Sequence, residues 1–285
     1  HDSVQRVFRG LLGNLFPGIP AVMVFYVVSG FCIHRTFRDG QGRPGWRFLA
    51  RRYLRIGLPL LAALAIIHFF SPDNVAFDLF ATSRAVVWSL VAEVIYYTIY
   101  PGLLAFRRRW GWTPLLAGAF LMAVLVILLK NPRASHPLVF GPWLTWLTGL
   151  PVWLVGCLLA EKCDESVSTV STPAIWCWRM GMWMLAAASS VLVFHAHIGY
   201  PWTMLPFSVA IFFWLRAEIH FHWNRAAWIV TEWCGRWSYS IYAMHLVIPD
   251  FLRKAGIDPA RSLPDWLAFL SLDLDRKSTR LNSSH

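Results

Sequence analysis

One carboxylate, Glu93, stands in the middle of an apolar run, WSLVAEVIYYTIYP. The spacing of Ser89, Tyr96, Tyr97 and Tyr100 from it places their hydroxyl groups along the same side of a helix. A carboxylate within a membrane helix is costly, so we expect this polar stripe to point into the protein interior. Two interpretations stay open, a role in chemistry and a purely structural ion pair or hydrogen bond.

Three arginines, Arg51, Arg52 and Arg55, share one helical face in the segment RRYLRIGLP. The planar guanidinium group suits phosphate oxygens, so this face could hold an anionic carrier such as the phosphates of coenzyme A. The alternative is that the three side chains only anchor a membrane helix at the lipid headgroups.

A third group of polar residues lies late in the chain, in the segment WSYSIYAMH. Ser238, Tyr242 and His245 are spaced four and three residues apart, again on one helical face. Histidine transfers protons near neutral pH, although a histidine satisfied by a neighbouring helix would give the same pattern. Earlier in the chain, Ser29 and Gly30 fit a tightly packed or unwound turn of a helix, because small residues allow close backbone approach.

The elements that must position these residues are membrane helices. Of the 285 residues, 57% are hydrophobic and 14% are charged, with 17 Trp and 20 Phe. Soluble domains carry roughly 25% charged residues, so the composition indicates a membrane protein.

Long continuous apolar runs predict helices rather than barrel strands. We expect an all-α transmembrane bundle with about eight complete spans, at 15–34, 53–70, 85–106, 113–129, 143–160, 180–196, 201–215 and 237–252. A ninth run begins near Leu263 and is cut off.

The net charge of +11 does not indicate nucleic acid, because the basic residues lie in short loops between apolar runs. If the loop 35–55 is cytoplasmic and sides alternate, 15 Lys and Arg lie on that side and 8 on the other. This bias predicts that the loop 35–55 faces the cytoplasm.

We expect no metal site, because no Cys, His or carboxylate pair has ligand spacing.

Together the four segments resemble the type 3 integral-membrane acyltransferase family, which contains bacterial O-antigen and surface-polysaccharide O-acetyltransferases. The matched residues are Gly18 to Ile33 around Ser29-Gly30; Arg51, Arg52, Arg55, Ile56 and, one residue late, Pro59; Trp88, Leu90, Glu93, Tyr96, Tyr97 and Pro101; and Ser238, Tyr239, Ser240, Tyr242 and His245. Each motif alone is loose, but their order over residues 17–245 is specific. The chain departs from the family at Gly18-Ile19-Pro20-Ala21, where the family has a glycine pair and a Gly-Val step.

The resemblance implies about ten spans, the first of which carries an arginine and, eleven residues later, a histidine that acts as a base. His1 lies at the expected distance before Ser29-Gly30 and would be that histidine. We therefore expect residues 1–274 to be an acyltransferase domain without its first helix, and residues 275–285 to be a non-native read-through tail.

The resemblance also implies a function. The protein would move an acyl group, most often acetyl, from acyl-CoA to a hydroxyl of a cell-surface carbohydrate or glycolipid at the bacterial inner membrane. No cofactor would be permanently bound, since acyl-CoA is a substrate. His1 and Glu93 would be catalytic, and Arg51, Arg52, Arg55, Ser29 and Gly30 would bind the donor. The substrate channel would be lined by Trp88, Tyr96, Tyr97, Ser240, Tyr242 and His245.

Two other classes of protein stay open from the residues alone. A transporter or flippase for a glycan or lipid-linked substrate would also line its pathway with polar residues. A membrane scaffold without catalytic activity is the third class, although it would have little use for a buried Glu93.

Overall fold

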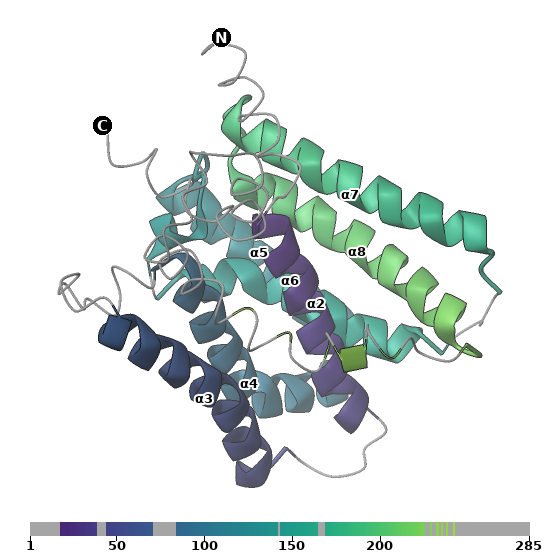
Figure 1. Cartoon of the computed structure of the whole chain (residues 1–285), viewed down its shortest axis with the longest axis horizontal. Helices are drawn as coiled ribbons and strands as arrows, with labels where there is room; N and C mark the ends of the chain where they lie inside the picture. The colour runs from purple at the N-terminus through teal and green to yellow at the C-terminus, as the bar shows by residue number, and fades with distance from the viewer. Residues whose placement is uncertain are drawn as a thin grey trace. The chain divides into compact units, whose positions relative to one another are not determined.

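The computed structural model describes residues 18–38, 44–70, 84–141, 143–164 and 169–225, together with residues 229, 232, 233, 235, 238 and 242. Helices dominate this part of the chain (Figure 1). The α-helices are α2 (Gly18–Phe37), α3 (Trp46–Phe70), α4 (Arg84–Trp110), α5 (Trp112–Lys130), α6 (Thr145–Lys162), α7 (Thr172–Phe194) and α8 (Tyr200–His222), with a short 3-10 helix, η1 (Pro137–Phe140). The prediction of an all-helical fold is confirmed for the described residues.

Five of these helices are long and apolar enough to cross a bilayer. They cover Gly18–Phe37, Trp88–Trp110, Trp112–Lys130, Thr172–Phe194 and Tyr200–His222. The two remaining described helices, α3 and α6, correspond to predicted spans but do not meet the same measure of length and apolar composition. The predicted span 237–252 lies outside the described residues except at 238 and 242. The count of about eight spans stays a prediction.

Several helices extend beyond their predicted limits. Helix α3 begins at Trp46 rather than at residue 53, so the three arginines of the RRYLR segment lie within the helix and not at its start. Helix α7 begins at Thr172, directly after Ser171, whose side-chain hydroxyl accepts a hydrogen bond of 3.4 Å from the backbone N–H of Ala174. A serine in this position satisfies one of the unpaired N–H groups that every helix start exposes. Both helices therefore begin with segments containing polar residues that precede the apolar part from which the span was predicted.

The chain divides into two compact units. The first unit contains residues 1–45 and 91–226, and the second contains residues 46–90 and 227–285. Within the first unit, α6 lies at the centre, because it contacts α2, α5, α8 and η1, and 13 of its 18 residues are buried. Helix α7 runs alongside α8 (Figure 1). A helix enclosed by protein on most sides can be less apolar than one that faces lipid, which explains the composition of α6.

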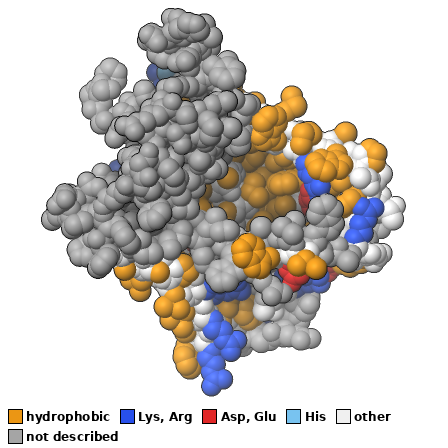
Figure 2. Space-filling view, viewed as in Figure 1, with side chains coloured by type: hydrophobic (Ala, Val, Ile, Leu, Met, Phe, Trp, Pro, Cys, Tyr) orange, Lys and Arg blue, Asp and Glu red, His pale blue; other side chains and the backbone are white. Residues whose placement is uncertain are grey.

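The outer helices of this unit carry apolar side chains on their exposed faces. Leu121 and Leu129 of α5 are 61% and 80% exposed, and Met184 of α7 is 65% exposed. Figure 2 shows hydrophobic side chains on the surface where α7 runs. Such faces would be unfavourable in water and suit contact with lipid.

Two glycines allow α2 and α6 to approach closely. A Cβ atom added at Gly30 of α2 would lie 2.1 Å from the backbone oxygen of Trp153, and one added at Gly156 of α6 would lie 2.0 Å from the backbone oxygen of Val27. No real side chain tolerates such a distance, so both positions require glycine. This crossing brings the polar residues of α2 and the indole of Trp153 together.

Candidate functional site

The carboxylate of Glu93 lies between α2, α4 and α6 with no exposed surface. Ser29 Oγ of α2 donates a hydrogen bond of 2.6 Å to Glu93 Oε1, and the hydroxyl of Tyr97, one turn further along α4, donates to the same oxygen. The two hydroxyl oxygens of Ser29 and Tyr97 are 3.1 Å apart. The indole Nε1 of Trp153 donates to Ser29 Oγ at 3.3 Å. A directional relay therefore runs from the Trp153 N–H through the Ser29 hydroxyl to the carboxylate.

An aromatic layer surrounds this group, which we call the Glu93 cluster (Ser29, Glu93, Tyr97 and Trp153). The ring of Tyr96 lies 5.5 Å from the rings of both Tyr26 and Trp153, measured between centroids. Its hydroxyl donates a hydrogen bond of 2.8 Å to the backbone oxygen of Trp146. Tyr96 therefore supports the cluster with its ring, while its hydroxyl is used to hold α4 against α6.

The predicted polar stripe of α4 is buried throughout. Ser89, Glu93 and Tyr96 have no exposed surface, and Tyr97 and Tyr100 are at most 2% exposed. The expectation that the stripe points into the protein interior is confirmed. Isolated buried charges are costly, so the two donors on Glu93 account for how the carboxylate is tolerated there.

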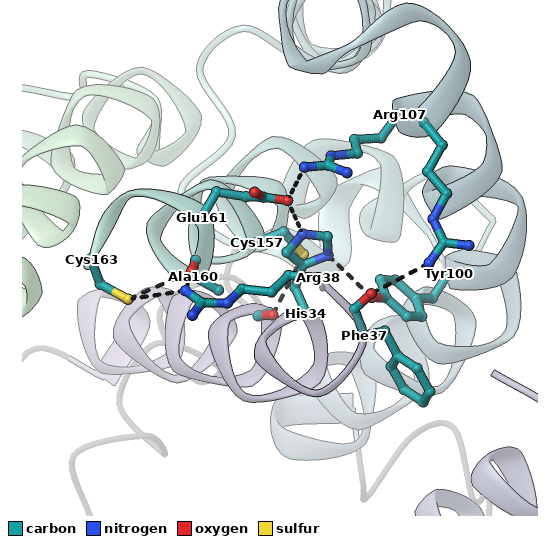
Figure 3. Close-up of polar contacts among 11 residues, drawn as sticks. His34, Phe37, Arg38, Tyr100, Arg107, Cys157, Ala160, Glu161 and Cys163 are labelled. Carbon is teal, nitrogen blue, oxygen red and sulfur yellow. Dashed lines mark hydrogen bonds and ion pairs between the residues drawn. The ribbon is translucent and has the colours of Figure 1, made fainter. Parts of the chain in front are cut away.

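A second polar group, which the sequence analysis did not identify, lies further along the same three helices (Figure 3). We call it the His34 cluster (His34, Tyr100, Arg107 and Glu161). His34 of α2 is 1% exposed; its Nδ1 lies 3.1 Å from the hydroxyl of Tyr100, and its Nε2 lies 2.7 Å from Glu161 Oε1. Arg107 forms an ion pair with the same carboxylate oxygen. Each of α2, α4 and α6 thus contributes a polar side chain at this level too.

Arginine and histidine side chains lie within hydrogen-bond distance of the backbone oxygens at the carboxyl ends of the helices beside this cluster. Arg38 donates to the backbone oxygen of Ala160 at 2.7 Å, and Arg108 donates to that of Phe37 at 3.4 Å. His220 Nε2 lies 2.9 Å from the backbone oxygen of Cys163. The last carbonyls of a helix lack partners within the helix and carry partial negative charge, so cations stabilise them.

Asp164, directly after α6, pairs with two of these cations. Arg38 forms an ion pair with it, and Arg35 Nη1 lies 3.3 Å from its Oδ1. Burial acts to raise the pKa of Asp164, but the hydrogen bonds from Arg38, Cys163 and Arg35 outweigh it and lower the pKa below its ordinary value of 3.8. Asp164 is therefore charged at neutral pH and holds α2 to the end of α6.

In the second unit, a residue of the predicted polar stripe meets a predicted channel residue. Ser89 Oγ lies 2.7 Å from the hydroxyl of Tyr242, so the stripe of α4 and the late polar segment are in contact. Trp88 is half-buried, and Ser238 donates to the backbone oxygen of Gly235 at 2.9 Å. Ser240 and His245 lie outside the described residues.

The predicted basic face lies on α3. Arg51 and Arg55 are exposed, and Arg52 is half-buried with its guanidinium carbon 5.7 Å from the centroid of the Phe48 ring. His1, the predicted base, lies outside the described residues. Gly30, predicted to bind the donor, lies against the backbone of α6. Among the residues the structure describes, no three His, Cys, Asp or Glu side chains are grouped as a metal site.

Comparison with known proteins identifies the family. The family model described as an acyltransferase domain (Acyl_transf_3) matches residues 3–272, which is nearly the whole chain and includes all four motifs. No curated protein and no solved structure matches the chain. The resemblance found in the sequence is confirmed, and it favours the enzyme over the transporter and the scaffold. The chain belongs to the acyltransferase 3 family and is a multi-pass membrane acyltransferase.

Proposed function

We propose that the protein is an O-acyltransferase of the bacterial inner membrane that moves an acetyl group from cytoplasmic acetyl-CoA to a hydroxyl of a cell-surface carbohydrate or glycolipid. The single observation that carries this proposal is the family match over residues 3–272, because it includes every motif on which the resemblance rests. The buried Glu93 cluster supports it from the structure, since it offers an organised set of proton donors and an acceptor within a membrane bundle.

The proposed reaction is attack of the acceptor hydroxyl on the thioester carbonyl. The oxygen–carbon bond of the new ester forms, the carbon–sulfur bond breaks, and the thiolate of coenzyme A leaves. His1 would take the hydroxyl proton and return it to the leaving thiolate, which makes the step balanced without any added cofactor. Glu93 would supply the negative charge that keeps Ser29 and Tyr97 oriented for this step.

The arginines of α3 would bind the donor. Arg51 and Arg55 are exposed, and phosphate groups of coenzyme A present the oxygens that guanidinium groups recognise. Arginines of the first unit have other roles, because Arg38 and Arg108 donate to helix carboxyl ends. The alternative, that the α3 arginines only anchor the helix at the headgroups, predicts no effect on donor affinity.

The acceptor would reach the site along polar and aromatic side chains. In this proposal Ser29 and Gly30 lie beside the acyl-bearing arm of the donor. The channel residues are Trp88, Tyr96, Tyr97, Ser240, Tyr242 and His245.

The test is the stoichiometry of transfer. Membranes that hold the protein are given acetyl-CoA labelled in the acetyl group, and released thiol and labelled carbohydrate are measured together. We expect one labelled ester for each thiol released, and none in membranes without the protein. If the thioester is never consumed while a glycan or lipid-linked solute crosses the membrane, the protein is a transporter and the proposal is wrong.

A further inference from the structure

Two bridges between α2 and α4 lie about one helical turn apart. In the first, Ser29 Oγ of α2 donates a hydrogen bond of 2.6 Å to Glu93 Oε1 of α4 and lies 3.1 Å from the Tyr97 hydroxyl. In the second, His34 Nδ1 and the Tyr100 hydroxyl are 3.1 Å apart. Tyr97 and Tyr100 are three residues apart, which corresponds to a rise of roughly 4.5 Å along α4. Two bridges at this separation fix both the rotation and the axial position of α4 against α2.

Helix α6 completes each bridge. Trp153 Nε1 donates to Ser29 Oγ at 3.3 Å, and Glu161 Oε1 lies 2.7 Å from His34 Nε2. Between these two levels, the thiol of Cys157 donates a hydrogen bond of 3.5 Å to the backbone oxygen of Gly30. The three helices are therefore tied together at both levels by side chains that are buried, except for the half-buried Glu161.

The proton arrangement of His34 follows from its partners. An ionised carboxylate only accepts hydrogen bonds, so Nε2 carries the proton that it donates to Glu161. In the neutral ring Nδ1 then accepts, and the Tyr100 hydroxyl must donate to it. Arg107 already neutralises Glu161, so no second positive charge is needed on the ring. Both ring nitrogens of His34 and the Tyr100 hydroxyl are thus satisfied in one arrangement, which makes the cluster a rigid connection.

We infer that His34 is a positioning residue for acyl transfer, because its bridge to Tyr100 holds α2 and α4 in the register that lets Ser29 of α2 donate to Glu93 of α4. This inference rests on the proposed role of the Glu93 cluster. His34 touches no reacting group in this account and acts only through α2. A small displacement of a reacting geometry lowers the turnover rate far more than it lowers binding.

The test removes the hydroxyl of Tyr100. The Tyr100→Phe variant should lower kcat for acetyl transfer from acetyl-CoA by about tenfold, while KM for acetyl-CoA changes by less than about twofold. The matched control is Tyr200→Phe. Tyr200 is also buried, but its hydroxyl lies 3.5 Å from Thr148, and its backbone N–H bonds to the oxygen of Ala134, in the loop before α6. The control should keep kcat within about twofold.

A second pair of variants separates positioning from stability. His34→Asn keeps a polar atom near the position of Nδ1, toward Tyr100, whereas His34→Gln keeps one near the position of Nε2, toward Glu161. A positioning role through the α2–α4 bridge predicts a higher kcat for Asn than for Gln at equal amounts of folded protein. Equal kcat values for the two variants would overturn it, even if Tyr100→Phe failed to accumulate.

The outcomes also distinguish this inference from the proposed function. A parental protein that consumes no acetyl-CoA would overturn the proposed donor, and with it the inference. An active parent whose Tyr100→Phe variant keeps the parental kcat would overturn the positioning role alone. A rise in KM or a fall in folded amount, with kcat unchanged, would assign the His34 cluster a structural role and would equally overturn it.

Discussion

Ser29 and Glu93, 64 positions apart in the sequence, are joined by a hydrogen bond of 2.6 Å in the interior of the first unit. Trp153 of α6 donates to the same serine oxygen. The close crossing of α2 and α6 therefore brings a third helix to this contact. A helix with a carboxylate, a helix with a small hydroxyl and a helix with an indole are all needed to form the site. The predictions below test the parts of this arrangement separately.

Adding a methyl group at Gly30 should separate α2 from α6. The Cβ of Gly30→Ala would lie 2.1 Å from the backbone oxygen of Trp153, so the helices must move apart. Overpacking of this kind costs about 1–3 kcal/mol, and we expect a lower midpoint of thermal unfolding in detergent together with reduced transfer. The matched control is Gly118→Ala, since a Cβ at this exposed position of α5 meets nothing within 4 Å. If both variants unfold at the parental temperature, the close crossing is not required.

Removing the arginines of α3 should weaken donor binding rather than chemistry. We expect Arg51→Ala and Arg55→Ala each to raise KM for acetyl-CoA by about tenfold, with little change in kcat, because a charge-assisted contact to phosphate is lost. The control substrate is acetyl-pantetheine, which carries the thioester without phosphates. Its KM should be the same for parent and variants. Equal losses with both substrates would show that these arginines do not bind phosphate.

Acidification should weaken the connection between α2 and α6. Because the pKa of Asp164 lies below its ordinary value of 3.8, its charged form stabilises the folded state at pH values above 3.8. This contribution is lost as the pH falls through the lowered pKa. The thermal midpoint of the parent should therefore drop, as the pH is lowered from 4 toward 2, by more than that of Asp164→Asn, which has no such proton to bind. Parallel curves for the two proteins would contradict the role of this ion pair.

The burial of Glu93 could be predicted from the sequence, whereas its partners could not. A carboxylate within an apolar run has to avoid lipid, and the spacing of Tyr97 places a hydroxyl one turn away on the same face. Nothing in the pattern of α4 specifies which helix faces that stripe. Ser29 and Trp153 belong to helices whose contacts are set by glycines, and glycines occur at many positions where nothing approaches them closely.

The sequence analysis does not include His34 among the site residues, because the predicted span ends at residue 34 and the next segment reads as a basic loop. The helix continues to Phe37, and both Ile33 and Phe37 are buried. Their spacing of four residues was the signal that could have placed His34 inside the protein. Glu161 gave no signal of its own, because an acidic residue at the end of an apolar run is ordinary in a solvated loop.

The central claim is that Glu93 is needed for acyl transfer and not only for folding. The most direct test measures transfer of labelled acetyl from acetyl-CoA by Glu93→Gln, by His1→Ala and by a control, Glu218→Gln. Glu218 of α8 is a half-buried carboxylate with a partner, since it pairs with Arg179 at 2.7 Å. We expect Glu93→Gln and His1→Ala to lose about 100-fold in transfer at parental amounts of folded protein, and the control to stay near the parental rate. Parental rates for both Glu93→Gln and His1→Ala would contradict the account.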